Sequence, residues 1–180
     1  MSNIIIDEKE FKIFIPQEKI EQRIKEIALQ IQDLYKEETP VFIIVLNGAF
    51  MFAGQFFKTY NSSCEIEFVK LISYIGSESS GEVINCIGIT EETVKNKKVI
   101  IIEDIIDSGI TMEYFIEYLS AWQPKSVEIV SLLFKPLSLK RDVNLNYFGF
   151  SIDPLFVVGY GLDYNHKGRN LTNIYQIVNP

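Results

Sequence analysis

The first strong pattern in the chain is a helical repeat of apolar residues. Between Gln17 and Glu38, isoleucine and leucine recur at three- and four-residue spacing with charged residues between them, and no Pro or Gly interrupts the segment. This spacing predicts an amphipathic helix. Pro40 ends it, and residues 41–46 follow as an uninterrupted apolar run that is too short for a helix. Such a run is typical of a strand buried on both faces.

Strand-like and helix-like segments alternate along the rest of the chain. The pattern predicts a helix over 50–60, strands over 64–75, 83–89 and 99–102, a helix over 111–122 and a strand over 126–134. This alternation favours an α/β fold with a parallel central sheet flanked by helices. The small polar segment 76–81 predicts a mobile loop. From Phe148 onward the chain has no long helical pattern, so we expect a cap over one edge.

Composition narrows the function classes. The chain has 180 residues, 47% of them hydrophobic, which is enough for one compact domain. A net charge of −7 disfavours broad contact with nucleic acid. Neither a signal peptide nor an apolar run of about 20 residues is visible, so we expect a soluble cytoplasmic protein without membrane contact. Cys64 and Cys86 lie too far apart for a CxxC redox pair or a zinc knuckle.

The candidate chemistry lies at one strand end. Open α/β sheets bind ligands at the carboxyl ends of their strands, and the best candidate end follows Ile102. Glu103 and Asp104 come next, and two adjacent carboxylates repel each other unless water or a cation neutralises them. Magnesium together with a pair of sugar hydroxyls would provide that neutralisation.

A second pattern follows directly, in the segment Asp107-Ser108-Gly109-Ile110-Thr111. It offers two hydroxyls, a glycine and successive backbone N–H groups at the start of a helix, which can bind a phosphate group. Asp and Ser before a helix are also ordinary N-caps, but the two patterns together favour a phosphate site. No GxxxxGK[ST] loop is present, and Gly159-Tyr160-Gly161 lacks the later glycine of a dinucleotide site, which disfavours ATP hydrolysis and NAD chemistry.

Residues 101–111 resemble the phosphoribosyl pyrophosphate motif of type I phosphoribosyltransferases, and their Glu-Asp-Ile-Ile-Asp-Ser-Gly form is similar to the hypoxanthine-guanine branch. The agreement extends through residues 68–74, 131–136 and 148–171, so it spans nearly the whole chain. It implies a magnesium-dependent purine salvage enzyme that transfers 5-phosphoribosyl from phosphoribosyl pyrophosphate to hypoxanthine or guanine, giving IMP or GMP and pyrophosphate. It also implies a homodimer or homotetramer.

The resemblance further implies one domain over residues 1–180. The core is expected at about 17–147, and a small hood is expected from the terminal segments 1–16 and 148–180. The Ala49 to Phe57 helix is a candidate for the interface between copies.

The resemblance assigns the chemistry to a few residues. Asp107 is the candidate general base beside the purine, because the purine must lose a proton while positive charge builds on the sugar. Glu103 and Asp104 are expected at the ribose hydroxyls and the magnesium ion, and Asp163 at a second magnesium ion or the base amine. Lys135 is expected to donate to the 6-oxo group, which would disfavour adenine.

The remaining site residues follow from the same resemblance. The 5′-phosphate is expected to bind at Asp107, Ser108, Gly109, Ile110 and Thr111, and the pyrophosphate at Leu46, Asn47, Gly48 and Arg169. The purine is also expected to stack on Phe156 and to contact main-chain groups of Val157. A loop that closes over the site is expected to begin at Ser73 and Tyr74. The family often has Lys or Arg where this chain has Asn47, so backbone amides are expected to bind the pyrophosphate there. The family also tends to hold this loop in a cis peptide.

Simpler roles stay open for individual residues. Lys135 alone would be a solvated lysine at a strand end, Arg169 a surface arginine, and the 76–81 loop a plain hairpin connection. His166 is more simply incidental than catalytic. Two rival functions are a transferase that prefers xanthine and a non-catalytic regulator that senses phosphoribosyl pyrophosphate. The regulator would need a basic surface for nucleic acid, which the acidic composition disfavours.

Overall fold

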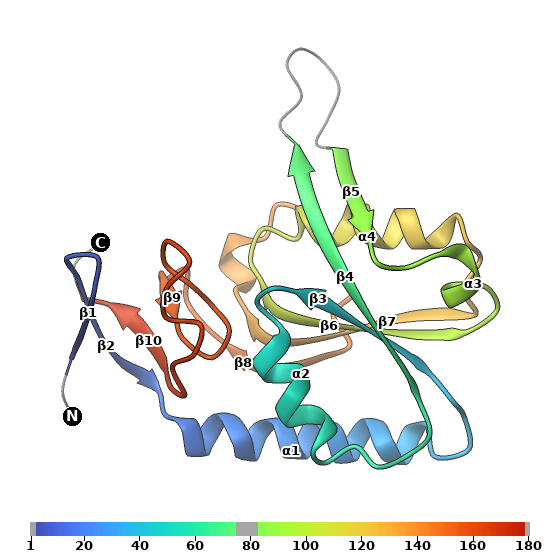
Figure 1. Cartoon of the computed structure of the whole chain (residues 1–180), viewed down its shortest axis with the longest axis horizontal. Helices are drawn as coiled ribbons and strands as arrows, with labels where there is room; N and C mark the ends of the chain where they lie inside the picture. The colour runs from blue at the N-terminus through green and yellow to red at the C-terminus, as the bar shows by residue number, and fades with distance from the viewer. Residues whose placement is uncertain (1–2, 75–82, 179–180) are drawn as a thin grey trace.

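The computed structural model describes residues 3–74 and 83–178, which form two sheets that lie side by side (Figure 1). The larger sheet has six strands in the order β5-β4-β3-β6-β7-β8. Strands β4, β3, β6, β7 and β8 run parallel, and β5 pairs antiparallel with β4 at the edge. The strand bounds are β3 Val41–Leu46, β4 Glu65–Tyr74, β5 Val83–Ile87, β6 Lys98–Ile106, β7 Ser126–Phe134 and β8 Tyr147–Ser151.

Helices cover both faces of this sheet (Figure 1). Helices α1 (Gln17–Leu34) and α2 (Phe50–Phe57) pack on one face, and α4 (Ile110–Ser120) with the short α3 (Glu91–Val94) packs on the other. Successive residues of β3 alternate between the two cores, with Phe42 beneath α2 and Ile43 in the core of α4. The predicted parallel sheet flanked by helices is therefore confirmed.

Both helices on the first face end earlier than the pattern predicts. Helix α1 stops at Leu34 instead of Glu38, and α2 stops at Phe57 instead of Tyr60. In each case a buried tyrosine follows the helix, Tyr35 and Tyr60, and the chain leaves the helix where that ring enters the core. Among the described residues, no helix combines the length and the apolar character needed to span a membrane.

Strand β6 is longer than predicted, and this matters for the site. The apolar run 99–102 suggests an end after Ile102, but the strand continues to Ile106. It continues because β7 supplies ladder partners throughout: Glu103 pairs with Ser131, Ile105 with Leu133 and Ile106 with Phe134. Glu103 and Asp104 therefore lie within the strand, and Asp107 is the first residue after it.

The hood is a four-stranded sheet in the order β1-β2-β10-β9, built from both ends of the chain. Its strands are β1 Ile4–Ile6, β2 Lys9–Ile15, β9 Val157–Val158 and β10 Ile174–Ile177. The expected boundary at residue 148 falls inside β8, which pairs with β7 in the large sheet. The hood therefore takes its C-terminal part from residues beyond Ser151.

The order of the large sheet locates its binding edge. Strand β3 lies between β4 and β6, so the chain builds outward from it in both directions. The carboxyl ends of β3 and β6 meet at this switch point, where open α/β sheets form their ligand crevice. Asn47-Gly48 leaves β3 there and Asp107 leaves β6.

Candidate active site

Asp107 and Lys135 meet at the carboxyl edge of the sheet. The residues before them, Ile106 and Phe134, are ladder partners of β6 and β7, so the two strands end side by side. Lys135 Nζ donates to Asp107 Oδ2 at 2.7 Å. Lys135 is only 8% exposed, whereas half of the Asp107 side chain is accessible. Lys135 is thus not a solvated lysine at a strand end, and its ammonium group is directed at the candidate base.

A cavity of about 220 Å³ opens beside Asp107. Its lining includes Glu103, Ser108, Gly109 and Thr111, together with the apolar Val45, Leu71, Ile105, Ile106 and Met112. Helix α4 begins here with Gly109 as its N-cap (φ 78°), and the Ser108 hydroxyl accepts from the N–H of Ile110, the first helical residue, at 3.4 Å. The free N–H groups and the positive end of the helix dipole favour a bound anion at such a position. The predicted phosphate segment therefore shares one cavity with Glu103 and Asp107.

Two residues that follow the short helix at Pro136–Ser138 bond to the predicted phosphate segment. The backbone N–H groups of Lys140 and Arg141 donate to the Ser108 carbonyl at 2.9 and 3.2 Å. A trans peptide directs its C=O and N–H to opposite sides, so the Gly109 N–H is turned away from these two residues. Sequence reasoning missed the contact, since nothing in the pattern around Lys140 indicates it.

Glu103 and Asp104 form a crowded pair of carboxylates. Glu103 Oε1 accepts from the Asp104 N–H at 3.3 Å, and Asp104 Oδ1 accepts from the Ile105 N–H at 2.8 Å. Burial, and then the neighbouring Asp104 carboxylate, raise the pKa of Glu103 well above its usual range. A cation would relieve this repulsion, so the pair fits magnesium. The described residues hold no group of three or more metal-binding side chains, so water and substrate oxygens would complete its coordination.

Two glycines join the hood to the core beside this pair. A Cβ atom on Gly48 would lie 1.5 Å from Asp104 Oδ2, so only glycine lets the carboxylate rest against this loop. Gly161 (φ 101°) approaches from the hood, and its Cβ would lie 1.9 Å from the Gly48 carbonyl oxygen. The Leu46–Asn47 peptide before Gly48 is cis. Sequence reasoning noted Gly161 only as an incomplete dinucleotide motif and missed this close approach.

Arg169 and Asp163 form an ion pair on the hood side. Arg169 Nη2 lies 2.6 Å from Asp163 Oδ1, and Nη1 donates to the Gly161 carbonyl at 2.7 Å. Asp163 Oδ2 accepts from the His166 N–H at 2.8 Å. Arg169 is therefore a fixed, partly buried side chain. Both Asp163 oxygens are engaged, so the structure does not group this carboxylate with Glu103 and Asp104.

The candidate purine residues Phe156 and Val157 come from the edge of the hood. The Phe156 ring is 44% exposed and contacts Phe11 and Tyr164, with centroids 6.3 and 5.6 Å apart. No hydrogen bond within the described part of the chain links Phe156 to Asp107 or Lys135.

The backbone N–H and C=O of Val157 in β9 make no ladder hydrogen bonds to β10. The Phe156 carbonyl accepts from the Ile177 N–H, and Val157 is paired with Gln176. Since backbone groups alternate along a strand, the N–H and C=O of Val157 point away from β10, toward the open edge. Val157 is only 6% exposed, and its expected main-chain contact with a base stays a prediction.

Ser73 and Tyr74 end strand β4, where their backbones pair with Ile84 and Val83 of β5. The loop predicted over 76–81 lies outside the described residues.

Comparisons with known proteins show the family to which the chain belongs. A family model for the phosphoribosyl transferase domain matches residues 14–165. The hypoxanthine-guanine phosphoribosyltransferase of Bacillus subtilis is 37% identical over 163 residues, 91% of each chain. The hypoxanthine phosphoribosyltransferase of Escherichia coli is 36% identical, covering 93% of this chain and 95% of the relative. A solved hypoxanthine phosphoribosyltransferase from Staphylococcus aureus superposes with a TM-score of 0.85 at 34% identity, covering 92% of this chain and 90% of that one.

Proposed function

This chain belongs to the phosphoribosyl transferase domain family, and we propose that it is a purine salvage enzyme that makes IMP or GMP. It transfers the 5-phosphoribosyl group of phosphoribosyl pyrophosphate to hypoxanthine or guanine and releases pyrophosphate. The observation that carries this proposal is the Asp107–Lys135 pair, in which Asp107 lines the same cavity as Ser108, Gly109 and Thr111 at the N-terminus of α4. One end of the site thus suits a purine and the other a phosphate.

At the purine end, Lys135 and Asp107 act together. An ammonium group has three N–H donors, so Lys135 can keep its bond to Asp107 and still donate to a 6-oxo group. The accessible oxygen of Asp107 takes the proton that the purine loses as its nitrogen attacks the sugar. Phe156 stacks on the base, and the free main-chain groups of Val157 read its edge. Adenine carries an amino group at position 6 and cannot accept from Lys135.

At the sugar-phosphate end, the 5′-phosphate binds the amides and hydroxyls of 107–111. The backbone of Leu46-Asn47-Gly48 and the guanidinium of Arg169 bind the pyrophosphate group. These fixed donors stabilise negative charge as the bond between the sugar and pyrophosphate breaks. Ser73 and Tyr74, at the end of β4, contribute to closing the site. A charged sugar pyrophosphate does not cross membranes, so the proposal places the enzyme in the cytoplasm with its substrate.

Glu103 and Asp104 would hold magnesium, as their crowded carboxylates suggest. When bound, magnesium supplies positive charge that neutralises the departing pyrophosphate. Asp163 would serve a second ion through the lone pairs that its bonds to Arg169 and to the His166 N–H leave over.

The chain is further proposed to self-associate through α2 and β4. Ile66 and Phe68 are ladder partners of Phe42 and Ile44, so they lie on the face that α1 and α2 cover, yet they are 41% and 51% exposed. Phe50 at the start of α2 is 44% exposed. An apolar surface of this kind is typical of a contact between proteins.

The proposed reaction is tested by mixing purified protein with phosphoribosyl pyrophosphate, magnesium and one base at a time. We expect nucleotide from hypoxanthine or guanine, none from adenine, and loss of turnover when EDTA removes magnesium. Product formed mainly from xanthine would shift the substrate assignment. Binding of phosphoribosyl pyrophosphate without turnover of any base would favour the sensing regulator.

Asp107→Asn is expected to lower kcat by about 10²- to 10⁴-fold, the usual contribution of a general base. The KM values for both substrates should change little, because the amide keeps the size of the side chain and loses only its ability to take a proton. Asp33→Asn, near the C-terminus of α1, removes a carboxylate that is 82% exposed and serves as the matched control. An unchanged kcat for Asp107→Asn would remove this residue as the base.

Self-association is tested by light scattering after size-exclusion chromatography. Each chain has a mass of 20.7 kDa, and we expect a dimer or tetramer for the unmodified protein. Phe68→Lys should lower the measured mass because it places a charge in the apolar surface. Leu137→Lys, at a residue that is 76% exposed on a different element, should not. A monomeric unmodified protein, or an assembly unaffected by Phe68→Lys, would contradict the proposal.

A further inference from the structure

The segment 159–171 carries both Asp163 and Arg169 and is built from tight turns. Tyr164 and Lys167 exchange two backbone hydrogen bonds of 3.0 Å. Between them, Asn165 and His166 have φ values of 50° and 65°, and positive φ at both central residues is the geometry of a type I′ turn. Asn165, His166 and Lys167 are exposed, so no core packing fixes the turn from within.

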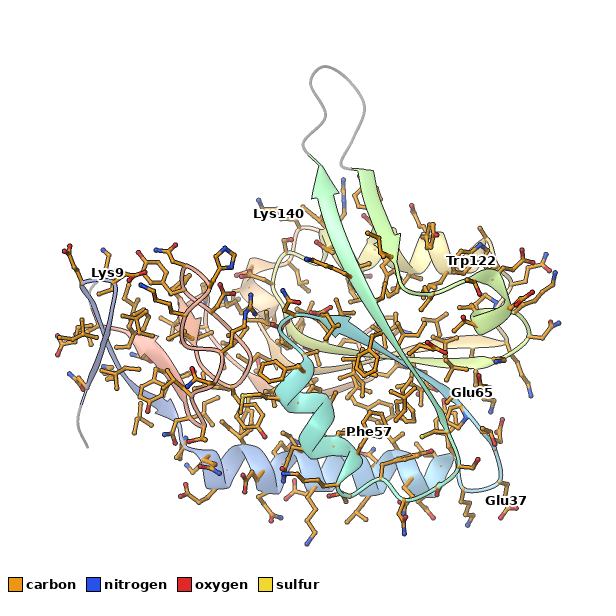
Figure 2. All side chains as sticks on the ribbon, viewed as in Figure 1. Lys9, Glu37, Phe57, Glu65, Trp122 and Lys140 are labelled. Atoms are coloured by element: carbon orange, nitrogen blue, oxygen red, sulfur yellow. The ribbon has the colours of Figure 1, made fainter. Side chains whose placement is uncertain are left out.

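A contact from the other end of the chain holds this turn. The β1–β2 hairpin, which ends beside Lys9 at the hood end of the molecule (Figure 2), has its own turn at Asp7 and Glu8. The Asp7 carboxylate accepts from Lys167 Nζ through Oδ1, and from Asn165 Nδ2 through Oδ2 at 3.3 Å. The hydrogen bond from Lys167 lowers the pKa of Asp7 below its ordinary value. Asp7 thus links two turns that are far apart in sequence.

Two contacts connect the Asn165–Lys167 turn to Asp163 and Arg169. The His166 N–H donates to Asp163 Oδ2 at 2.8 Å, so the turn helps to orient the carboxylate that pairs with Arg169. Gly168, the residue before Arg169, is packed tightly: a Cβ there would lie 2.6 Å from Val158 Cγ2 and 3.1 Å from Ile6 Cδ1. The N-terminal hairpin therefore contacts the segment on both sides of Lys167.

We propose that Asp7 is a positioning residue that anchors the Asn165–Lys167 turn and so presents Arg169 and Asp163 to the pyrophosphate group. Asp7 contacts neither of these side chains and acts only through the turn. The inference rests on the proposed role of Arg169, and it adds the N-terminal hairpin to the parts of the chain that set affinity for phosphoribosyl pyrophosphate.

The first test compares Asp7→Asn with Glu8→Gln in steady-state kinetics. Both remove one negative charge from the same turn, but within the described residues the Glu8 carboxylate has no hydrogen bond or ion pair. Asp7→Asn should raise KM for phosphoribosyl pyrophosphate about two- to fivefold, as expected for loss of exposed charged contacts, with little change in kcat. Glu8→Gln should leave both constants unchanged.

A second readout does not depend on activity. Hydrogen exchange at the His166 amide, which bonds to Asp163, should be faster in Asp7→Asn and unchanged in Glu8→Gln. The charge exchange Asp7→Lys with Lys167→Asp should restore slow exchange and the original KM. A role confined to overall stability would instead lower the melting temperature without separating KM from kcat.

The possible results separate the anchoring of the turn by Asp7, the positioning role of Asp7 and the proposed reaction. Unchanged exchange at His166 in Asp7→Asn would overturn the anchoring, and faster exchange with unchanged KM would overturn the positioning role while leaving the proposed reaction intact. If Glu8→Gln changed KM and the exchange at His166 as much as Asp7→Asn does, the net charge of the hairpin would explain both effects, and the specific role of Asp7 would be overturned. If the unmodified protein transfers phosphoribosyl to no base, the proposed function fails, and the exchange data still decide whether Asp7 anchors the turn.

Discussion

The register between strands β6 and β7 is the constraint on which the site depends. Because Ile106 is opposite Phe134, the next residues along both strands are brought together, and Lys135 reaches Asp107 at 2.7 Å. A nearly buried ammonium group is costly without a partner charge, so the Asp107 carboxylate offsets the cost of burying Lys135 at this edge of the sheet. The contact that completes the fold here is the one from which the proposed purine chemistry starts.

A second constraint joins the two sheets. The backbones at Gly48 and Gly161 approach so closely that a side chain at Gly161 would collide with the Gly48 carbonyl oxygen, and a side chain at Gly48 would collide with the Asp104 carboxylate. Through this joint the hood places Arg169 next to the loop after β3, while Asp104 rests on the other side of that loop. The core thus provides the cavity at the N-terminus of α4 and the carboxylates, and the hood provides the edge strand β9 and Arg169.

Local signals in the sequence predicted most of the core and the phosphate segment. Short apolar runs such as 41–46 can only be buried strands, and the order of residues 103–111 is distinctive. The full length of β6 was not predicted, because polar Glu103 and Asp104 interrupt its apolar run while β7 supplies the missing ladder partners. The Gly48–Gly161 approach and the Asp7–Lys167 contact join distant segments, so no local pattern indicates them.

The central claim is that Asp107 and Lys135 act on the purine as one unit, and a double-mutant cycle tests it most directly. The measurement is kcat/KM for hypoxanthine, at saturating phosphoribosyl pyrophosphate, in the unmodified protein, Asp107→Asn, Lys135→Met and the double variant. The account predicts that the second substitution costs much less once the first is present, because the pair is already broken. Losses that simply multiply would mean that the two residues act independently and would contradict the account.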